Sequence, residues 1–288
     1  MIEEKIISFK TTNQIGLNMN LYKSNINKKD ITILYLHGGG LLYGVRDDLP
    51  RIYIDKFLDA GYDILALDYP LAPESKLDTI LSSTYEGITY YLNNYKQVFN
   101  LNSNKFILFG RSAGSYLAFM MCNMLIKNNN LLPLSIISLY GYTRLDEVEF
   151  NTPSKYYNKL PKVTDESINR IISNEPVTYG PMNERFSLYI KARQEGNWIE
   201  ALCNKENILN YSIDDEALKS FPPTILAAAT SDPDVPYRIS KKISRIIPNS
   251  TLITIYEEEH DFDRDIKNNS GKEAYDKIIS WLNSKIIK

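Results

Sequence analysis

Short, continuous runs of apolar residues recur along the chain and alternate with longer segments in which apolar positions recur every three or four residues. A run without polar alternation is typical of a strand buried on both faces of a sheet, whereas the longer spacing is typical of an amphipathic helix. The runs predict strands at residues 31–36, 64–67, 106–109, 134–139, 224–229 and 251–256. The spacing predicts helices at residues 51–59, 77–95, 116–127, 237–247 and 272–287. This alternation predicts an α/β fold with a mostly parallel central sheet and helices on both of its faces.

The first part of the chain has a different pattern. Residues 6–9 and 17–22 are short segments in which apolar and polar positions alternate, and the polar stretch 11–14 lies between them. Such alternation is typical of strands that expose one face to water. We expect these segments to form an antiparallel hairpin at one edge of the sheet.

One interval interrupts the alternation of strands and helices. About eighty residues separate the strand that ends near Tyr140 from the strand that starts at Thr224, and ordinary connections are far shorter. Within this interval, helical patterns occur at residues 165–172 and 184–202. We therefore expect a single α/β domain over residues 1–288, with a helical cap inserted at residues 142–222.

Composition and charge limit the classes of function. The chain has 33 basic and 35 acidic residues, a net charge of −2, and its basic residues are scattered, so neither a nucleic-acid partner nor a membrane-surface patch is expected. No apolar run reaches the ~18 residues of a membrane span, and the start at residues 1–5 lacks the order of a signal peptide. Cys122 and Cys203 form no disulfide framework and have no metal-ligand spacing. We expect a cytoplasmic protein without a metal or another cofactor.

The predicted strand at 106–109 leads into Gly110-Arg111-Ser112-Ala113-Gly114, a G-x-S-x-G sequence followed by a predicted helix. A serine hydroxyl becomes a good nucleophile when it stands out from the backbone beside a base. A sharp strand-to-helix turn achieves this, and its crowding requires glycine on both sides of the serine. The alternative is a Gly/Ser turn that only joins a strand to a helix. A chance match to G-x-S-x-G somewhere in such a chain has a probability on the order of a few per cent. Ser112 is the candidate nucleophile.

A base and an acid follow two later strands. His260 comes after the last predicted strand and Asp232 after the preceding one. In an open parallel sheet the carboxyl ends of the strands meet at one crevice, so these side chains can reach Ser112. His260 would take the serine proton and Asp232 would hold the imidazole in the required tautomer. A surface-loop histidine is the alternative for His260; Asp234, and more distantly Asp146, compete with Asp232 as the acid.

The sequence His37-Gly38-Gly39-Gly40 ends an earlier predicted strand. A tetrahedral intermediate needs N–H groups aimed at its oxyanion, and the loss of one such donor costs about 2.7–4 kcal/mol. Consecutive glycines can turn their amides inward without side chains that block the substrate. We predict that the N–H groups of Gly38, Gly39 and Ala113 form an oxyanion hole, and that His37 braces the loop. Without the serine motif, the same glycines would indicate only a flexible turn.

These motifs, together with Asp68-Tyr69-x-Leu71-Ala72-Pro73-Glu74, resemble the hormone-sensitive-lipase-like carboxylesterase branch of the α/β-hydrolases. The resemblance covers nearly the whole chain except the cap. It implies a cofactor-free hydrolase of small or short-acyl carboxylic esters that works through an acyl-enzyme, with the cap lining the substrate pocket. The branch usually has Asp where this chain has Arg111, and glycine at the position of Ser115.

Two side chains are candidates for the substrate pocket. Tyr43 lies just past the glycine loop, and Arg111 immediately precedes the serine. The expected partner is a small ester, and open sheet edges are compatible with a homodimer.

Other functions fit parts of the same pattern. A small-amide or peptide hydrolase would use the same three side chains, because the triad serves both leaving groups. A non-catalytic ligand-binding homologue is a further alternative. It is disfavoured because a protein of that kind would be expected to lack Ser112, His260 or the glycine loop, and this chain has all three.

Overall fold

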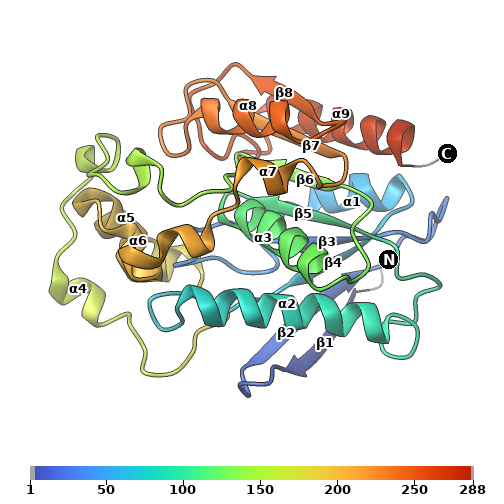
Figure 1. Ribbon diagram of the computed structural model, residues 1–288, viewed down its shortest axis with the longest axis horizontal. Coiled ribbons are helices and arrows are strands. Elements are labelled where there is room, and N and C mark those ends of the chain that lie inside the picture. The colour runs from blue at the N-terminus through green and yellow to red at the C-terminus, as the bar shows by residue number, and fades with distance from the viewer. Residues whose placement is uncertain (1–3, 287–288) are drawn as a thin grey trace.

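The computed structural model describes residues 4–286 and contains an eight-stranded sheet with the order β1-β2-β4-β3-β5-β6-β7-β8 (Figure 1). The strands are β1 Glu4–Lys10, β2 Gly16–Tyr22, β3 Thr32–Leu36, β4 Asp63–Leu67, β5 Phe106–Arg111, β6 Ile136–Leu139, β7 Thr224–Ala229 and β8 Thr251–Ile255. The pairings from β4 through β8 are all parallel, while β1 pairs antiparallel with β2, and β2 with β4. The predicted parallel sheet and edge hairpin are confirmed.

The longer helices follow the strands, as the pattern predicts. They are α1 Arg51–Asp59, α2 Leu77–Asn94, α3 Ala113–Lys127, α8 Tyr237–Ile246 and α9 Asn269–Lys285. Residue 287, the last of the helix predicted at 272–287, and residues 1–3 of the acidic start lie outside the described part. Within residues 4–286 no helix combines the length and apolarity that crossing a membrane requires.

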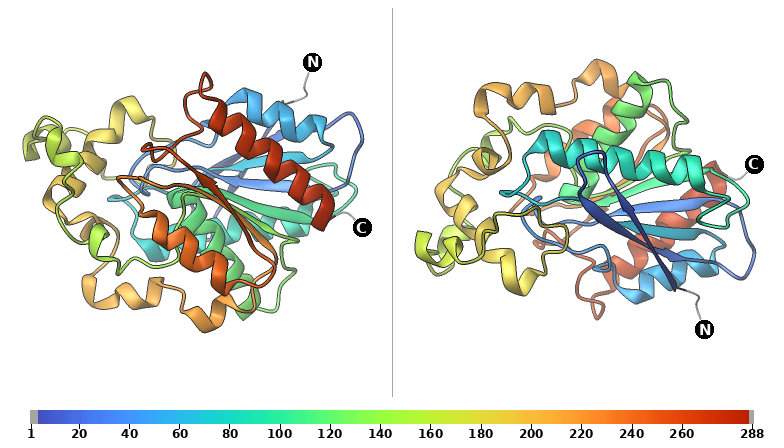
Figure 2. Two further views of the ribbon diagram at one scale, coloured as in Figure 1. Left: turned by 90° about the horizontal axis from the view of Figure 1, so that it is seen from above. Right: turned by 90° about the horizontal axis from the view of Figure 1, so that it is seen from below.

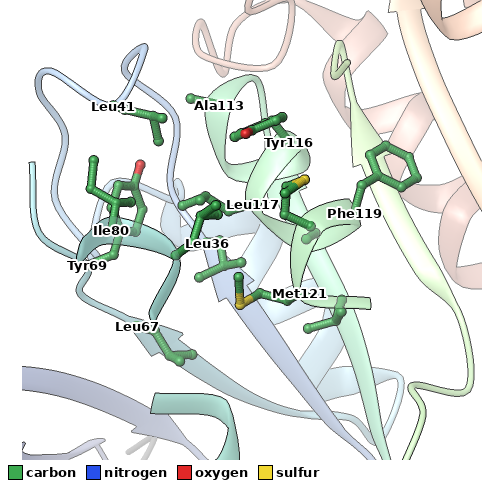
Figure 3. Close-up of a cluster of buried hydrophobic side chains, with 14 of the residues drawn as sticks. Leu36, Leu41, Leu67, Tyr69, Ile80, Ala113, Tyr116, Leu117, Phe119 and Met121 are labelled. Atoms are coloured by element: carbon green, nitrogen blue, oxygen red, sulfur yellow. The ribbon is translucent and has the colours of Figure 1, made fainter. Parts of the chain in front are cut away.

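Each face of the sheet carries its own apolar core. Side chains of α1 and α9, such as Phe57 and Tyr275, pack on one face around Phe109. Residues of α2, α3 and α8 belong to the second cluster, on the other face. The two views in Figure 2 show helices on either side of the strands, and Figure 3 shows Leu117 and Met121 of α3 beside Leu36 and Leu67 of the sheet. Helices on both faces explain why β3 to β7 are buried throughout.

The segment between β6 and β7 forms short helices rather than strands. They are η1 Val148–Phe150, η2 Tyr157–Lys159, α4 Asp165–Asn169, α5 Met182–Glu195, α6 Trp198–Leu202, η3 Lys205–Tyr211 and α7 Asp215–Leu218. In Figure 1, α4, α5 and α6 lie beyond one end of the sheet. Bridges join Gly180 to Gly44 and Val177 to Leu71, so this segment is attached to the loops that follow β3 and β4. We interpret residues 142–222 as the inserted cap.

Three predicted helix boundaries are wrong. The helix expected at 184–202 is two helices, because Gly196 ends α5 in the left-handed conformation, with φ of 72°. The helix expected at 165–172 ends at Asn169. The helix expected from residue 116 instead begins at Ala113, since the chain turns directly from Ser112 into helix. A glycine and a serine in that first turn weaken the helical signal in the sequence.

Candidate active site

Ser112 lies at a sharp turn between β5 and α3. Its φ of 51° and ψ of −117° place it in a conformation that non-glycine residues rarely adopt, at a cost of about 1–3 kcal/mol. A Cβ atom at Gly110 would lie 2.1 Å from the carbonyl oxygen of Gly114, and one at Gly114 would lie 2.0 Å from the carbonyl oxygen of Leu36. Only glycine fits at these two positions, which explains the spacing of the G-x-S-x-G sequence.

The structure brings Ser112, Asp232 and His260 together. Nε2 of His260 lies 2.9 Å from Oγ of Ser112, and Nδ1 lies 2.7 Å from Oδ2 of Asp232. Oδ1 of Asp232 accepts hydrogen bonds from the backbone N–H groups of Asp234 and Val235, at 2.8 and 2.9 Å. These two hydrogen bonds hold the carboxylate of Asp232 in place independently of its contact with the imidazole.

The competing acids lie elsewhere. The carboxylate of Asp234 binds Arg193 of the cap, and that of Asp146 binds Arg144. The structure thus places Asp232, rather than either alternative, beside His260.

The surroundings of His260 determine its tautomer and its charge. A carboxylate only accepts hydrogen bonds, so Nδ1 carries the proton and Nε2 is free to accept the hydroxyl proton of Ser112. Burial favours the neutral imidazole, but the charge and hydrogen bond of Asp232, with smaller contributions from Asp234 and Asp261, outweigh it. The pKa of His260 consequently lies above its ordinary value.

The glycine loop faces the serine. A Cβ atom at Gly38 would lie 3.1 Å from the carbonyl oxygen of Arg111 and 3.5 Å from Cβ of Ser112, so Gly38 adjoins the nucleophile. Gly39 has φ of +108°, and a Cβ there would lie 1.9 Å from the carbonyl oxygen of Tyr43. Among residues 4–286, no hydrogen bond occupies the N–H groups of Gly38, Gly39 or Ala113. These amides remain available to an anion.

His37 supports this loop from below. The side chain is fully buried and its ring stacks on Tyr69, with centroids 4.1 Å apart. Nδ1 lies 2.8 Å from the carbonyl oxygen of Gly38 and 3.1 Å from the hydroxyl of Tyr69. Burial lowers the pKa of His37. The described contacts of His37 are with Gly38 and Tyr69, whereas Nε2 of His260 lies 2.9 Å from Oγ of Ser112, so His260 is the histidine placed to act as its base.

A cavity of about 720 Å³ opens above the serine. Its aromatic side chains are Tyr43, Tyr140, Tyr156, Tyr157, Phe186 and Tyr189, most of them from the cap. The predicted pocket residues Tyr43 and Arg111 both lie in its lining, although the guanidinium of Arg111 is turned toward buried carboxylates. Within the described part of the chain, no group of three or more His, Cys, Asp and Glu side chains is arranged to hold a metal ion.

The sequence model of the BD-FAE family matches residues 19–247. The chain belongs to the BD-FAE family. The matched range contains Ser112 and Asp232 and ends before His260. An α/β-hydrolase superfamily protein from Enterococcus faecalis has a similar structure, with a TM-score of 0.83 and 34% identity over 97% of this chain and 99% of that chain. The predicted α/β-hydrolase fold is confirmed.

Two further relatives extend this picture of the BD-FAE family member. A Staphylococcus aureus Mu50 protein with unknown function has a TM-score of 0.88 and 30% identity, covering 99% of this chain and all of that chain (100%). An esterase of Gibberella moniliformis is 24% identical over 213 residues, which are 73% of this chain and 59% of that protein. The chain spans less than two thirds of the length of the first curated relatives that it matches.

Two buried arginines of this BD-FAE family member organise the polar side chains around the site. Arg111 contacts Tyr140 Oη with Nε at 2.8 Å, Asp263 with Nη2 at 3.0 Å and Asp48 with Nη1 at 3.3 Å. We call Arg111, Asp48, Asp263 and Tyr140 the strand-end cluster, because each follows or ends a strand of the sheet or lies in the loop beyond it.

The second arginine belongs to the cap. Arg193 of α5 pairs with Asp234 at 3.1 Å, and the same carboxylate accepts hydrogen bonds from Tyr189 at 2.9 Å and Tyr157 at 3.2 Å. We call these four residues the cap cluster. Because the backbone N–H of Asp234 also binds Asp232, this cluster joins the cap to the loop that holds the candidate acid.

Sequence reasoning misses Tyr140 and the role of Asp234 in the cap. Tyr140 directly follows β6, the same kind of position that Ser112 has after β5. That position is the signal by which it could have been found. No comparable signal exists for Arg193, which is one polar residue among many in a helical segment.

Proposed function

We propose that the protein is a serine hydrolase that cleaves small or short-acyl carboxylic esters through an acyl-enzyme. The observation that carries the proposal is the continuous hydrogen-bonded chain from Asp232 through His260 to Ser112 beside the unoccupied amides of the glycine loop. The esterase among the curated relatives supports the same reaction class.

In the first half-reaction, Oγ of Ser112 attacks the ester carbonyl carbon while its proton moves to Nε2 of His260. The oxyanion that forms is stabilised by the N–H groups of Gly38, Gly39 and Ala113. The carbon–oxygen bond to the alcohol then breaks, and the imidazolium returns the proton to the leaving alcohol. Asp232 stabilises the imidazolium in between, which agrees with the raised pKa of His260.

In the second half-reaction, water replaces the alcohol. His260 takes a proton from water as the water oxygen attacks the acyl carbon, and the proton passes to Oγ of Ser112 when the carboxylic acid leaves. The cap side chains over the serine, among them Tyr157, Phe186 and Tyr189, would surround the acyl or alcohol group.

A panel of p-nitrophenyl esters of increasing acyl length, with matched p-nitroanilides, tests the proposal. We expect turnover of the short esters and a loss of at least ~10⁴-fold in kcat for Ser112→Ala, because the nucleophile is gone. Ser83→Ala is the matched control, since Ser83 is a buried serine of α2 far along the chain from the site. Retained turnover in Ser112→Ala would refute the nucleophile, and faster turnover of the anilides would favour the amide hydrolase.

A further inference from the structure

Tyr140 packs directly against the imidazole of His260. The two ring centroids are 4.7 Å apart and the rings are tilted by 59°. Tyr140 also meets Phe262 edge to face, with ring centroids 5.4 Å apart. The aromatic ring of Tyr140 therefore packs against the imidazole and limits how far it can tilt.

The hydroxyl of Tyr140 is held at two points. It accepts a hydrogen bond from Nε of Arg111 at 2.8 Å and donates one to Oδ1 of Asp263 at 2.7 Å. Arg111 immediately precedes Ser112, and Asp263 lies in the loop that carries His260. One phenol thus connects the turn of the nucleophile to the loop of the base.

The backbone of Tyr140 is also constrained. Its φ is 41°, in the left-handed region that favours glycine, while its N–H donates to the carbonyl oxygen of Ala227 at 2.7 Å. A bulky residue in this region carries strain that its surroundings must offset. The ring and the hydroxyl contacts are what tyrosine provides there and glycine would not.

We propose that Tyr140 is a positioning residue for His260, with its ring setting the plane of the imidazole and its hydroxyl fixing the ring between Arg111 and Asp263. The proposal rests on the proposed function, in which Nε2 of His260 must face Oγ of Ser112. Although Tyr140 lies in the lining of the cavity, its hydroxyl is directed into the strand-end cluster. It therefore acts through His260, and small errors in the placement of a base reduce the rate strongly.

The chain offers a matched control for this idea. Tyr275 of α9 is buried like Tyr140 and also donates its hydroxyl to Asp263, at 2.8 Å. Its ring stacks on Tyr53, whereas the ring that contacts the imidazole of His260 is that of Tyr140. Tyr140→Phe and Tyr275→Phe each remove one oxygen and one donor to the same carboxylate, but only Tyr140→Phe frees the ring that supports His260.

We expect Tyr140→Phe to lower kcat on the best ester by about 5–20-fold with little change in KM, and Tyr275→Phe to keep kcat within about two-fold of the wild type. Tyr140→Leu, which also removes the ring, should lower kcat further than Tyr140→Phe. Equal kcat values for the two Phe variants would overturn the proposal, because the effect would then follow only from a weakened Asp263. Thermal melting of each variant separates loss of fold from loss of rate.

A second readout does not need turnover. The chain has only two histidines, and His37, stacked on Tyr69 under the glycine loop, is an internal reference. In protein labelled with ¹⁵N-histidine at one fixed pH, the imidazole signals of His260 should broaden or split in Tyr140→Phe and stay sharp in Tyr275→Phe. Unchanged His260 signals in Tyr140→Phe would contradict the proposal.

The two readouts separate failure of this inference from failure of the proposed function. If the wild type hydrolyses no ester while the His260 signals respond to Tyr140→Phe alone, the proposed function fails and the positioning stands. If the wild type hydrolyses esters and the two Phe variants behave alike, the positioning fails and the proposed function stands.

Discussion

Arg111 and Arg193 are equally buried, 3% and 2% exposed, yet they are held in different ways. Arg111 faces two carboxylates, Asp48 and Asp263, and the hydroxyl of Tyr140. Arg193 faces one carboxylate, Asp234, and is otherwise surrounded by aromatic rings 5.6–5.8 Å from its guanidinium carbon. Those rings belong to Phe150, Tyr157, Tyr189 and Trp198.

This difference determines whether losing the arginine or losing its carboxylate destabilises each cluster more. Without Arg111, two carboxylates of the strand-end cluster would face each other with no cation between them. Asp263 would keep the hydroxyls of Tyr140 and Tyr275, but Asp48 would stand near it as a second negative charge. In the cap cluster Asp234 would likewise keep two tyrosine hydroxyls without Arg193, and no second carboxylate of that cluster would repel it. Arg193 without Asp234 would be a buried cation whose Nε and Nη1 already have no hydrogen-bond partner among the described residues. An unpaired buried charge is the costly outcome in both cases.

The largest effect is expected from Arg111→Met. It should lower the free energy of unfolding by about 3–5 kcal/mol, because it leaves Asp263 and Asp48 as unpaired like charges. Asp263→Asn should cost about 1–3 kcal/mol, since the guanidinium keeps Asp48. Urea unfolding followed by circular dichroism measures both. A larger loss in Asp263→Asn than in Arg111→Met would contradict this account of the strand-end cluster.

In the cap cluster we expect the opposite order. Asp234→Asn should cost about 2–4 kcal/mol, because Arg193 loses the carboxylate that pairs with it, whereas Arg193→Met should cost about 1–2 kcal/mol, because the thioether can pack on the surrounding rings. The chain has two tryptophans, and Trp198 lies against Arg193. In a Trp281→Phe background, Trp198 fluorescence in urea therefore reports the cap and its contact with the glycine loop, because Nε1 of Trp198 donates to the carbonyl oxygen of Gly40 at 2.9 Å.

Two outcomes would contradict the inferred difference between the cap cluster and the strand-end cluster. If Arg193→Met proves more damaging than Asp234→Asn, the aromatic rings do not substitute for hydrogen bonds as we infer. If Trp198 fluorescence and circular dichroism change at the same urea concentration in Asp234→Asn, the cap and the sheet unfold as one unit and the loss is not local to the cap.

The central strands β3 to β7 could be predicted because each one is a short apolar run that is buried along its whole length. β7, for example, is buried at all its positions and coincides with the predicted run 224–229. The division of the cap into α5 and α6 could not be predicted in the same way. Gly196 interrupts an otherwise helical pattern, and an isolated glycine inside a helix is also tolerated. Packing against Thr152 and Pro153, far along the chain, leaves no room for a Cβ there.

In the candidate site, too, residues in local motifs could be predicted and residues joined by long-range contacts could not. Ser112 and the glycine loop could be predicted because each belongs to a short local motif. His260 could be predicted from its position after the last predicted strand. The sequence left Asp234 as a competitor of Asp232, and the structure shows each carboxylate with its own partner. The two arginine clusters gather residues from loops far apart in sequence, so no local pattern contains them.

The smallest expected effect concerns pH. His260 must be neutral to accept the serine proton, so kcat/KM on an ester should fall as the pH drops through the pKa of His260. Asp232, Asp234 and Asp261 raise this pKa. Removing the negative charge in Asp234→Asn should therefore lower the pKa and move the acid limb of the profile to lower pH, by less than about one unit. Arg193→Met removes a positive charge from the same cluster and should move the limb to higher pH. Shifts in the same direction in both variants would mean that distortion of the cap, rather than its charge, controls the imidazole.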